Sequence, residues 1–238
     1  MPATSGSTLA PTSSFNPGQA LSVPPAARKL AGFRDWACSD EFPEGGRIDF
    51  LDGMMEVDMS PEDLYTHGAV KTALAARLYQ EVVEAELGHL FVDRTRVTCP
   101  AAGLSAEPDL VVVLWPALED GRVKQIPAAS KGAGRFVELE GAPDLIVEIL
   151  SDSSYQKDTQ RLPQLYARAG VPELWLVDAR GNELSFQLHA LHGDSYQPVL
   201  PDADGWLTSG VLGRSCRLRR QPSRFSSWRY FLDLQPIR

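Results

Sequence analysis

The chain has 238 residues, of which 43% are hydrophobic and 23% are charged, and its formal net charge is −8. This length is typical of one globular domain with tails, and no apolar run approaches the roughly 20 residues that span a bilayer. The negative charge argues against a protein that coats nucleic acid without specificity, because such binding depends on clustered lysine and arginine.

The N-terminal region and the cysteines indicate an intracellular setting. The first residues lack the basic start and apolar middle of a secretion signal, so we expect a cytoplasmic protein without a membrane partner. Residues 1–27 are rich in small and polar residues and predict a disordered leader, because they offer little apolar surface to offset the entropy of ordering. The cysteines lack metal-ligand spacing, which indicates reduced thiols; they are Cys38, Cys99 and Cys216.

The first half of the domain predicts a hairpin, a helix and two strands. Residues 47–60 alternate around an Asp-Gly pair, which is typical of a tight β-hairpin. Residues 66–88 predict an amphipathic helix with one apolar face, formed by Val70, Leu74, Leu78, Val82 and Ala85. Residues 89–99 and 107–115 predict two strands, and the Gly- and Pro-punctuated residues 116–141 predict a long loop.

The second half continues with alternating elements. Residues 142–151 predict a third strand, and residues 158–170 predict a helix that begins near residue 160, because Pro163 fits only its first turn. Residues 172–178 predict a fourth strand, and residues 182–200 predict a further hairpin. This order indicates a mixed α/β fold.

The C-terminal segment differs in charge from the rest of the chain. From Val211 onward it has seven arginines against one acid, Asp233, so the remainder carries −14, the total of −8 less these six net positive charges. Residues 216–238 are therefore expected to form a basic and aromatic extension packed on a domain at residues 28–215. The arginines could bind phosphate or could pair with the protein's own acids.

Two acids in predicted strands raise the question of function. Glu148 lies in the middle of the third strand, where an ionised carboxylate loses its water and requires a partner. Asp109 opens the preceding strand, and strands consecutive in sequence are usually neighbours, so we expect the two acids to converge. A divalent metal would join them and could activate water and phosphate. The alternative is that Glu148 pairs with Arg161 or Arg135, and that Asp109 only caps its strand.

Several segments resemble a known nuclease family. EPDLVVV, PDLIVEILSDSSYQKD and LYARAGVPELWLVD, with IDFLDGMMEVDMS and THGAV, are similar to the Uma-two family within the PD-(D/E)XK nuclease superfamily. This resemblance covers about residues 30–215 and implies a restriction-endonuclease-like core of a helix, a three-stranded meander, a crossover helix and a strand, with added β-hairpins. It implies that Asp109, Glu148 and the carbonyl of Ile149 bind Mg²⁺ or Mn²⁺. It also implies DNA as the substrate, and cleavage of both strands would favour a homodimer.

The sequence departs from the superfamily pattern at its catalytic lysine. The superfamily places a lysine where this chain has Leu150, or in related members near Leu162, and neither residue is basic. Lys157 and Arg161 could replace it, and we predict Lys157 as the catalytic residue because an ammonium group can orient water and stabilise phosphate charge. Without the usual lysine, the alternative is an inactive nuclease-like fold that acts as a binding or regulatory module.

Other polar residues receive weaker assignments. His67 could contact phosphate or could simply begin the first helix. Asp158 is expected to cap the crossover helix. The remaining candidates are expected on solvated strand surfaces; they are Asp49, Glu56, His189 and His192.

Overall fold

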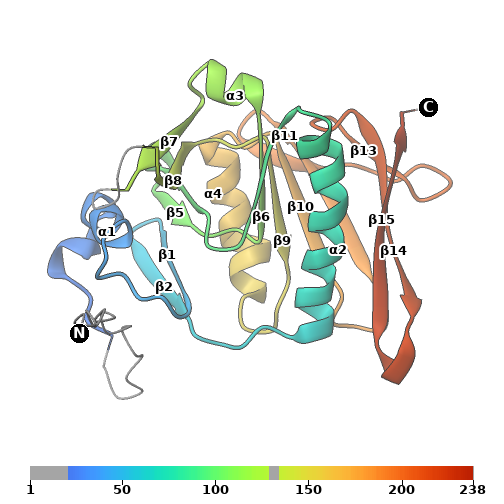
Figure 1. Cartoon of the computed structure of the whole chain (residues 1–238), viewed down its shortest axis with the longest axis horizontal. Coiled ribbons are helices and arrows are strands. Elements are labelled where there is room, and N and C mark those ends of the chain that lie inside the picture. Colours follow the sequence, from blue (N-terminus) through green and yellow to red (C-terminus); the bar gives the residue numbers. More distant parts are fainter. Residues whose placement is uncertain (1–20, 129–133, 238) are drawn as a thin grey trace, which may run out of the picture.

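The computed structural model describes residues 21–128 and 134–237 (Figure 1). The helices are α1 (Leu30–Ala37), α2 (Ala69–Leu78), α3 (Trp115–Glu119) and α4 (Leu162–Ala169), and shorter helical turns lie at Pro25–Arg28, Leu64–Gly68, Tyr79–Glu84, Pro100–Ala102, Lys157–Arg161 and Arg224–Ser226. The strands are β1 (Arg47–Leu51), β2 (Met54–Asp58), β3 (Gly88–Val92), β4 (Arg96–Cys99), β5 (Leu104–Ala106), β6 (Leu110–Leu114), β7 (Val123–Pro127), β8 (Phe136–Gly141), β9 (Leu145–Ile149), β10 (Glu173–Asp178), β11 (Ser185–His192), β12 (Ser195–Pro198), β13 (Leu207–Ser209), β14 (Arg214–Pro222) and β15 (Trp228–Pro236). The predicted mixed α/β class is confirmed.

The central sheet has the strand order β12-β11-β10-β9-β6-β3. Strands β3, β6 and β9 are antiparallel neighbours, and α4 then crosses to β10, which is parallel to β9. Helices α2 and α4 cover opposite faces, because Val147 packs in one apolar cluster with α2 while Ile146 packs in another with α4. Alternation places Glu148 on the α4 side, inside the protein.

The remaining strands form two further sheets, with the orders β2-β1-β5-β4-β8-β7 and β13-β14-β15. The single strand predicted at residues 89–99 is wrong: Asp93 and Arg94 have positive φ, and the turn that they make sends β3 and β4 into different sheets. The long loop predicted at residues 116–141 is also wrong, because it contains α3, β7 and β8, while residues 129–133 lie outside the described part. Gly121 and Gly134 lie in turns with positive φ, and Val123 and Leu139 are buried against β6.

The ends of the predicted domain also require revision. Residues 1–20 of the predicted leader lie outside the described residues, but Pro25–Arg28 form a helical turn and Ala27 is buried beside Phe33. Residues 25–27, which were predicted to belong to the leader, are thus part of the folded structure. Ala85 is exposed and lies beyond the helical turn that ends at Glu84, so it does not extend the apolar face. Within the described residues, no helix has the length and apolarity needed to cross a membrane.

The C-terminal strands form a hairpin that lies alongside α2 (Figure 1). Leu218 and Leu232 of this hairpin pack in the same buried cluster as Leu74 of α2. The boundary predicted after residue 215 therefore falls inside β14, and the hairpin completes the cover of the helix. We keep the term C-terminal hairpin for residues 214–236.

Candidate active site

Asp109 and Glu148 lie next to each other at one end of the central sheet. In the antiparallel pairing of β6 with β9, Leu110 faces Val147, so the residue before Leu110 meets the residue after Val147. The backbone N–H of Ile149 donates to Oδ2 of Asp109 at 2.8 Å. Both carboxylates are only 1% exposed. The structure thus brings together the two acids selected from the sequence.

Glu148 has no basic partner among the described residues. Its Oε1 accepts a hydrogen bond of 2.6 Å from the hydroxyl of Tyr166 on α4, and its buried Oε2 has no hydrogen-bond partner. Burial, followed by the negative charges of Asp158 and Asp109, raises the pKa of Glu148 well above its ordinary value. Without a bound cation, Glu148 therefore holds its proton more tightly than an ordinary glutamate does.

The predicted arginine alternative for Glu148 is wrong. Arg161 donates to the carbonyl oxygen of Leu51 at 3.2 Å and forms an ion pair with Glu56. Within the described part of the chain, Arg135 makes no ion pair with Glu148 either. Glu56, with a side chain 30% exposed in this pair, does lie at the accessible strand surface expected for it.

Asp109 lies in the opposite electrostatic environment. Its Oδ1 is 2.9 Å from Arg47 Nη2 and 3.3 Å from Lys71 Nζ, and its Oδ2 is 3.3 Å from His67 Nε2. Burial alone would raise the pKa of Asp109, but the His67 hydrogen bond and the charges of Arg47 and Lys71 lower it well below its ordinary value. The site therefore combines a carboxylate that ionises easily with one that holds its proton more tightly than usual.

Lys157 reaches the site from the turn that precedes α4. Its Nζ lies 2.9 Å from Oδ2 of Asp49 and 3.9 Å from Oδ1 of Asp158. Burial lowers the pKa of Lys157, but the charges of Asp49, Asp158 and Glu148 outweigh this effect and raise it. Lys157 is therefore a buried ammonium group whose charge acts on Glu148.

Two acidic residues near Lys157 differ from expectation. Asp49 is 1% exposed and accepts the backbone N–H of Glu107 at 3.1 Å, so the predicted solvated position is wrong. Asp158 lies inside the helical turn and accepts a hydrogen bond from Ser154, so it is not the predicted cap. Burial raises the pKa of Asp158 to about 6, and its buried Oδ1 has no hydrogen-bond partner.

The two positions at which the superfamily carries its catalytic lysine are occupied here by buried leucines. Leu150 is 5% exposed, and Leu162 is 1% exposed in the cluster beneath α4. His189 and His192 lie on β11, outside this site, as expected for a surface hairpin; His189 contacts Gln187 at 3.3 Å.

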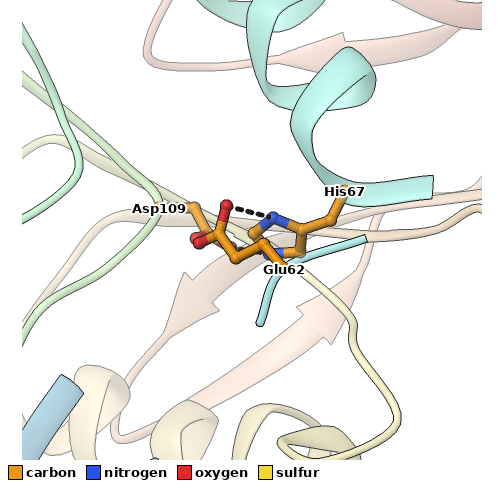
Figure 2. A group of neighbouring side chains, drawn as sticks. All are labelled: Glu62, His67 and Asp109. Carbon is orange, nitrogen blue, oxygen red and sulfur yellow. Dashed lines mark ion pairs between the residues drawn. The ribbon is translucent and has the colours of Figure 1, made fainter. Parts of the chain in front are cut away.

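A second group of possible metal ligands includes Asp109, and the sequence analysis did not predict this grouping. Figure 2 shows His67 beside the carboxylates of Asp109 and Glu62. Its Nε2 lies 3.3 Å from Oδ2 of Asp109, and its Nδ1 lies 3.2 Å from Oε2 of Glu62. Ligand atoms of these three residues all lie within 4.8 Å of one another, a spacing that suits a metal ion. Lys71 was detectable, because it follows His67 by one helical turn. The sequence around Glu62 and Arg47 contains no pattern that marks either residue as part of a site.

The site opens onto two hollows that share Arg47 in their walls. One has a volume of about 340 Å³ and reaches His67 and Glu62. The other has a volume of about 610 Å³ and reaches Asp49 and Lys157. Solvent-sized molecules can therefore reach Arg47, His67 and Lys157, which lie next to the two buried carboxylates.

The donor set fits a hard divalent cation. Carboxylate oxygens are preferred ligands of Mg²⁺ and Mn²⁺, and the unpartnered oxygens of Glu148 and Asp158 offer acceptor capacity that the protein itself does not use. Arg47 and Lys71 neutralise Asp109, so a cation there would compete with these two groups.

Comparison with known proteins yields a family match and a structural match. A family model described as "Uma2: Putative restriction endonuclease" matches residues 30–219. The crystal structure of a "putative nuclease belonging to DUF820" from Anabaena variabilis matches with a TM-score of 0.54 and 19% sequence identity, over 74% of this chain and 86% of that chain. No curated protein matches the chain.

Proposed function

The chain belongs to the Uma2 family, described as putative restriction endonucleases, and we propose that it is a metal-dependent nuclease that hydrolyses phosphodiester bonds in DNA. The carrying observation is the pair of buried carboxylates, Asp109 and Glu148, at adjacent positions of neighbouring strands, beside Arg47, which lines both hollows. The order α2, β3, β6, β9, α4 and β10 supports a restriction-endonuclease-like core.

The predicted metal ligands remain part of this proposal. Asp109, Glu148 and the carbonyl of Ile149 would hold Mg²⁺ or Mn²⁺. When bound, the ion polarises a phosphate oxygen and lowers the pKa of a coordinated water. Glu148 would hold the ion in its ionised form, and Tyr166 would keep the carboxylate oriented through its hydrogen bond.

Basic residues of the chain supply the remaining chemistry. Lys157 is the proposed catalytic lysine: its ammonium group can orient the attacking water and stabilise negative charge on the phosphate. Arg47, whose side chain is 20% exposed and borders both hollows, is placed to bind a phosphate oxygen that enters the site.

One experiment tests the proposal through two readouts. Purified protein is incubated with plasmid and linear DNA in Mn²⁺ or EDTA, and Mn²⁺ binding is measured by calorimetry. Wild type is expected to cut in Mn²⁺, and Glu148→Gln is expected to lose both cutting and metal binding. Glu173→Gln is the matched control, because Glu173 is another buried glutamate with a raised pKa, located at the start of β10, away from the site.

The cluster of Glu62, His67 and Asp109 adds a further variant to this experiment. Glu62→Gln is expected to retain Mn²⁺ binding and cutting if the ion lies between Asp109 and Glu148. Loss of binding in Glu62→Gln, with binding retained in Glu148→Gln, would instead locate the ion at the three residues of Figure 2.

A second function is favoured by the absence of the usual lysine. Leu150 and Leu162 are buried and apolar, and Lys157 is engaged with Asp49. A nuclease-like fold that binds without cutting would account for these features. It predicts that wild type binds no Mn²⁺ and that Glu148→Gln raises the free energy of unfolding.

A further inference from the structure

The tip of the C-terminal hairpin, residues 221–229, carries exposed basic and aromatic side chains. Phe225 is 96% exposed and Trp228 is 36% exposed. Arg224 and Arg229 are exposed, and neither guanidinium has an ion pair or a side-chain hydrogen bond among the described residues. The family match ends at residue 219, so the tip lies outside the part of the chain that resembles the family.

The other arginines of the hairpin have partners. Arg219 and Arg217 pair with Asp233, and Arg214 pairs with Glu81 at 3.1 Å. These residues match the expectation that the C-terminal arginines neutralise the protein's own acids. The positive charge that remains is concentrated at the tip, where residues 221–229 include two arginines and no acid.

The backbone of the tip is also unusual. Phe225 has φ of 57°, a left-handed conformation that is unfavourable for a bulky side chain. The fold gains no burial from this residue, since its side chain is almost fully exposed. A large aromatic residue at a strained and exposed position does not contribute to stability, and backbone strain of this kind is concentrated at functional sites.

The tip lies at the same end of the molecule as the candidate active site. The hairpin runs along α2 from Glu81, which pairs with Arg214, toward Asp63, whose charge acts on Tyr230 next to the tip. Asp63 caps the helical turn that carries His67. On the other side, Arg220 donates to the carbonyl oxygen of Gly181 at 3.2 Å, in the loop that follows β10 beside the end of β9.

We propose that the hairpin tip is a clamp for duplex DNA, in which Arg224 and Arg229 bind backbone phosphates while Phe225 inserts against the base stack. Arginines bind phosphate through charge and paired hydrogen bonds, and apolar wedges of this kind enter the grooves of duplexes. Arg220 stacks on Trp228, with its guanidinium carbon 4.3 Å from the ring centroid, and thereby stiffens the base of the tip. This inference rests on the proposed function, because it assigns the same substrate to a second surface.

Binding without cutting tests the clamp separately from the nuclease. The full chain is titrated into a fluorescently labelled duplex in EDTA at several salt concentrations, and anisotropy is measured. Arg224→Ala with Arg229→Ala is expected to raise Kd about tenfold and to lower the salt slope of log Kd by about two. The charge-matched control is Arg28→Ala with Arg168→Ala, since the turn Pro25–Arg28 lies across the molecule from the hairpin (Figure 1).

Phe225→Gly separates recognition from stability. Glycine accepts positive φ without strain, so the melting temperature should stay equal or rise, while Kd for the duplex rises about tenfold with the salt slope unchanged. A purely structural Phe225 predicts the reverse, a lower melting temperature with unaltered Kd.

Several results would overturn the clamp. One is that wild type and the tip variants have equal Kd values, or that wild type binds no duplex. Another is that the tip binds single strands more strongly than duplex, or that size-exclusion chromatography shows a dimer that depends on the tip. Metal-dependent cutting with tip-independent binding would leave the nuclease standing and remove the clamp. Tip-dependent binding without metal-dependent cutting would support the clamp and remove the nuclease.

Discussion

The hydroxyl of Tyr166 donates to Oε1 of Glu148 at 2.6 Å, and it is the hydrogen-bond partner of a carboxyl group that is otherwise enclosed by the protein. The hydrogen bond joins α4 to β9 and fixes one oxygen of Glu148, while the other oxygen has no partner. Burial favours the protonated form of Glu148 when no cation is present, and its second oxygen remains available to a ligand.

Tyr166→Phe should destabilise the fold, because it leaves a buried acceptor without its donor. We expect the free energy of unfolding to fall by about 1–3 kcal/mol in urea denaturation at neutral pH. The control is Tyr196→Phe, which removes a hydrogen bond of 2.8 Å to the carbonyl oxygen of Val171. Mn²⁺ affinity should fall only in Tyr166→Phe; an equal loss in both variants would contradict the orienting role.

The stability of the metal-free protein should depend on pH through Glu148. Its pKa in the folded state lies above the ordinary value of 4.5, so the folded state binds the proton more tightly than the unfolded state. This stabilisation is complete below pH 4.5 and is lost as the pH rises toward the folded-state pKa. The total loss is about 1.4 kcal/mol for each unit by which the folded-state pKa exceeds the unfolded-state pKa. Asp158 adds a similar loss between its ordinary value of 3.8 and about 6.

Glu148→Gln isolates the contribution of Glu148 to this pH dependence. Glutamine cannot ionise, so the variant should be more stable than wild type at pH 8, and the two stability curves should approach each other in acid. Urea denaturation in EDTA across this range measures the effect. Parallel curves for wild type and variant would show that Glu148 has an ordinary pKa.

Lys157→Met should lower the rate of DNA cleavage without removing the metal. We expect kcat to fall by about 10²–10³, as for the loss of one group that stabilises transition-state charge, with Mn²⁺ affinity within about threefold of wild type. Arg161→Gln is the control, since Arg161 pairs with Glu56. If Arg161→Gln is the variant that loses activity, the assignment of Lys157 is wrong.

Arg47→Gln should strengthen Mn²⁺ binding, because it removes a positive charge 2.9 Å from Asp109. An increase of about tenfold is expected, together with a loss of about 1–3 kcal/mol of stability in the absence of metal. Arg122→Gln breaks a comparable ion pair of 2.5 Å with Asp144, at the other end of β9, and should leave Mn²⁺ affinity unchanged. Unaltered affinity in Arg47→Gln would show that no cation binds beside Asp109.

Much of the scaffold was predictable because its signals are local. The helical spacing of Val70, Leu74 and Leu78 and the apolar run around Glu148 depend only on residues close in sequence. The split between β3 and β4 was not predictable in this way, since a two-residue turn inside an alternating segment leaves the alternation almost intact.

The sequence by itself determined the mixed α/β class, the family resemblance and the neighbouring positions of Asp109 and Glu148, because consecutive strands tend to pair. Only the tertiary structure decided which of the two acids has a lowered pKa and which has a raised one. Arg47 reaches Asp109 across 62 residues of sequence, and Lys157 reaches Asp49 across 108. Ionisation depends on burial and on the charges nearby in space, and those charges come from separate elements that share no local pattern.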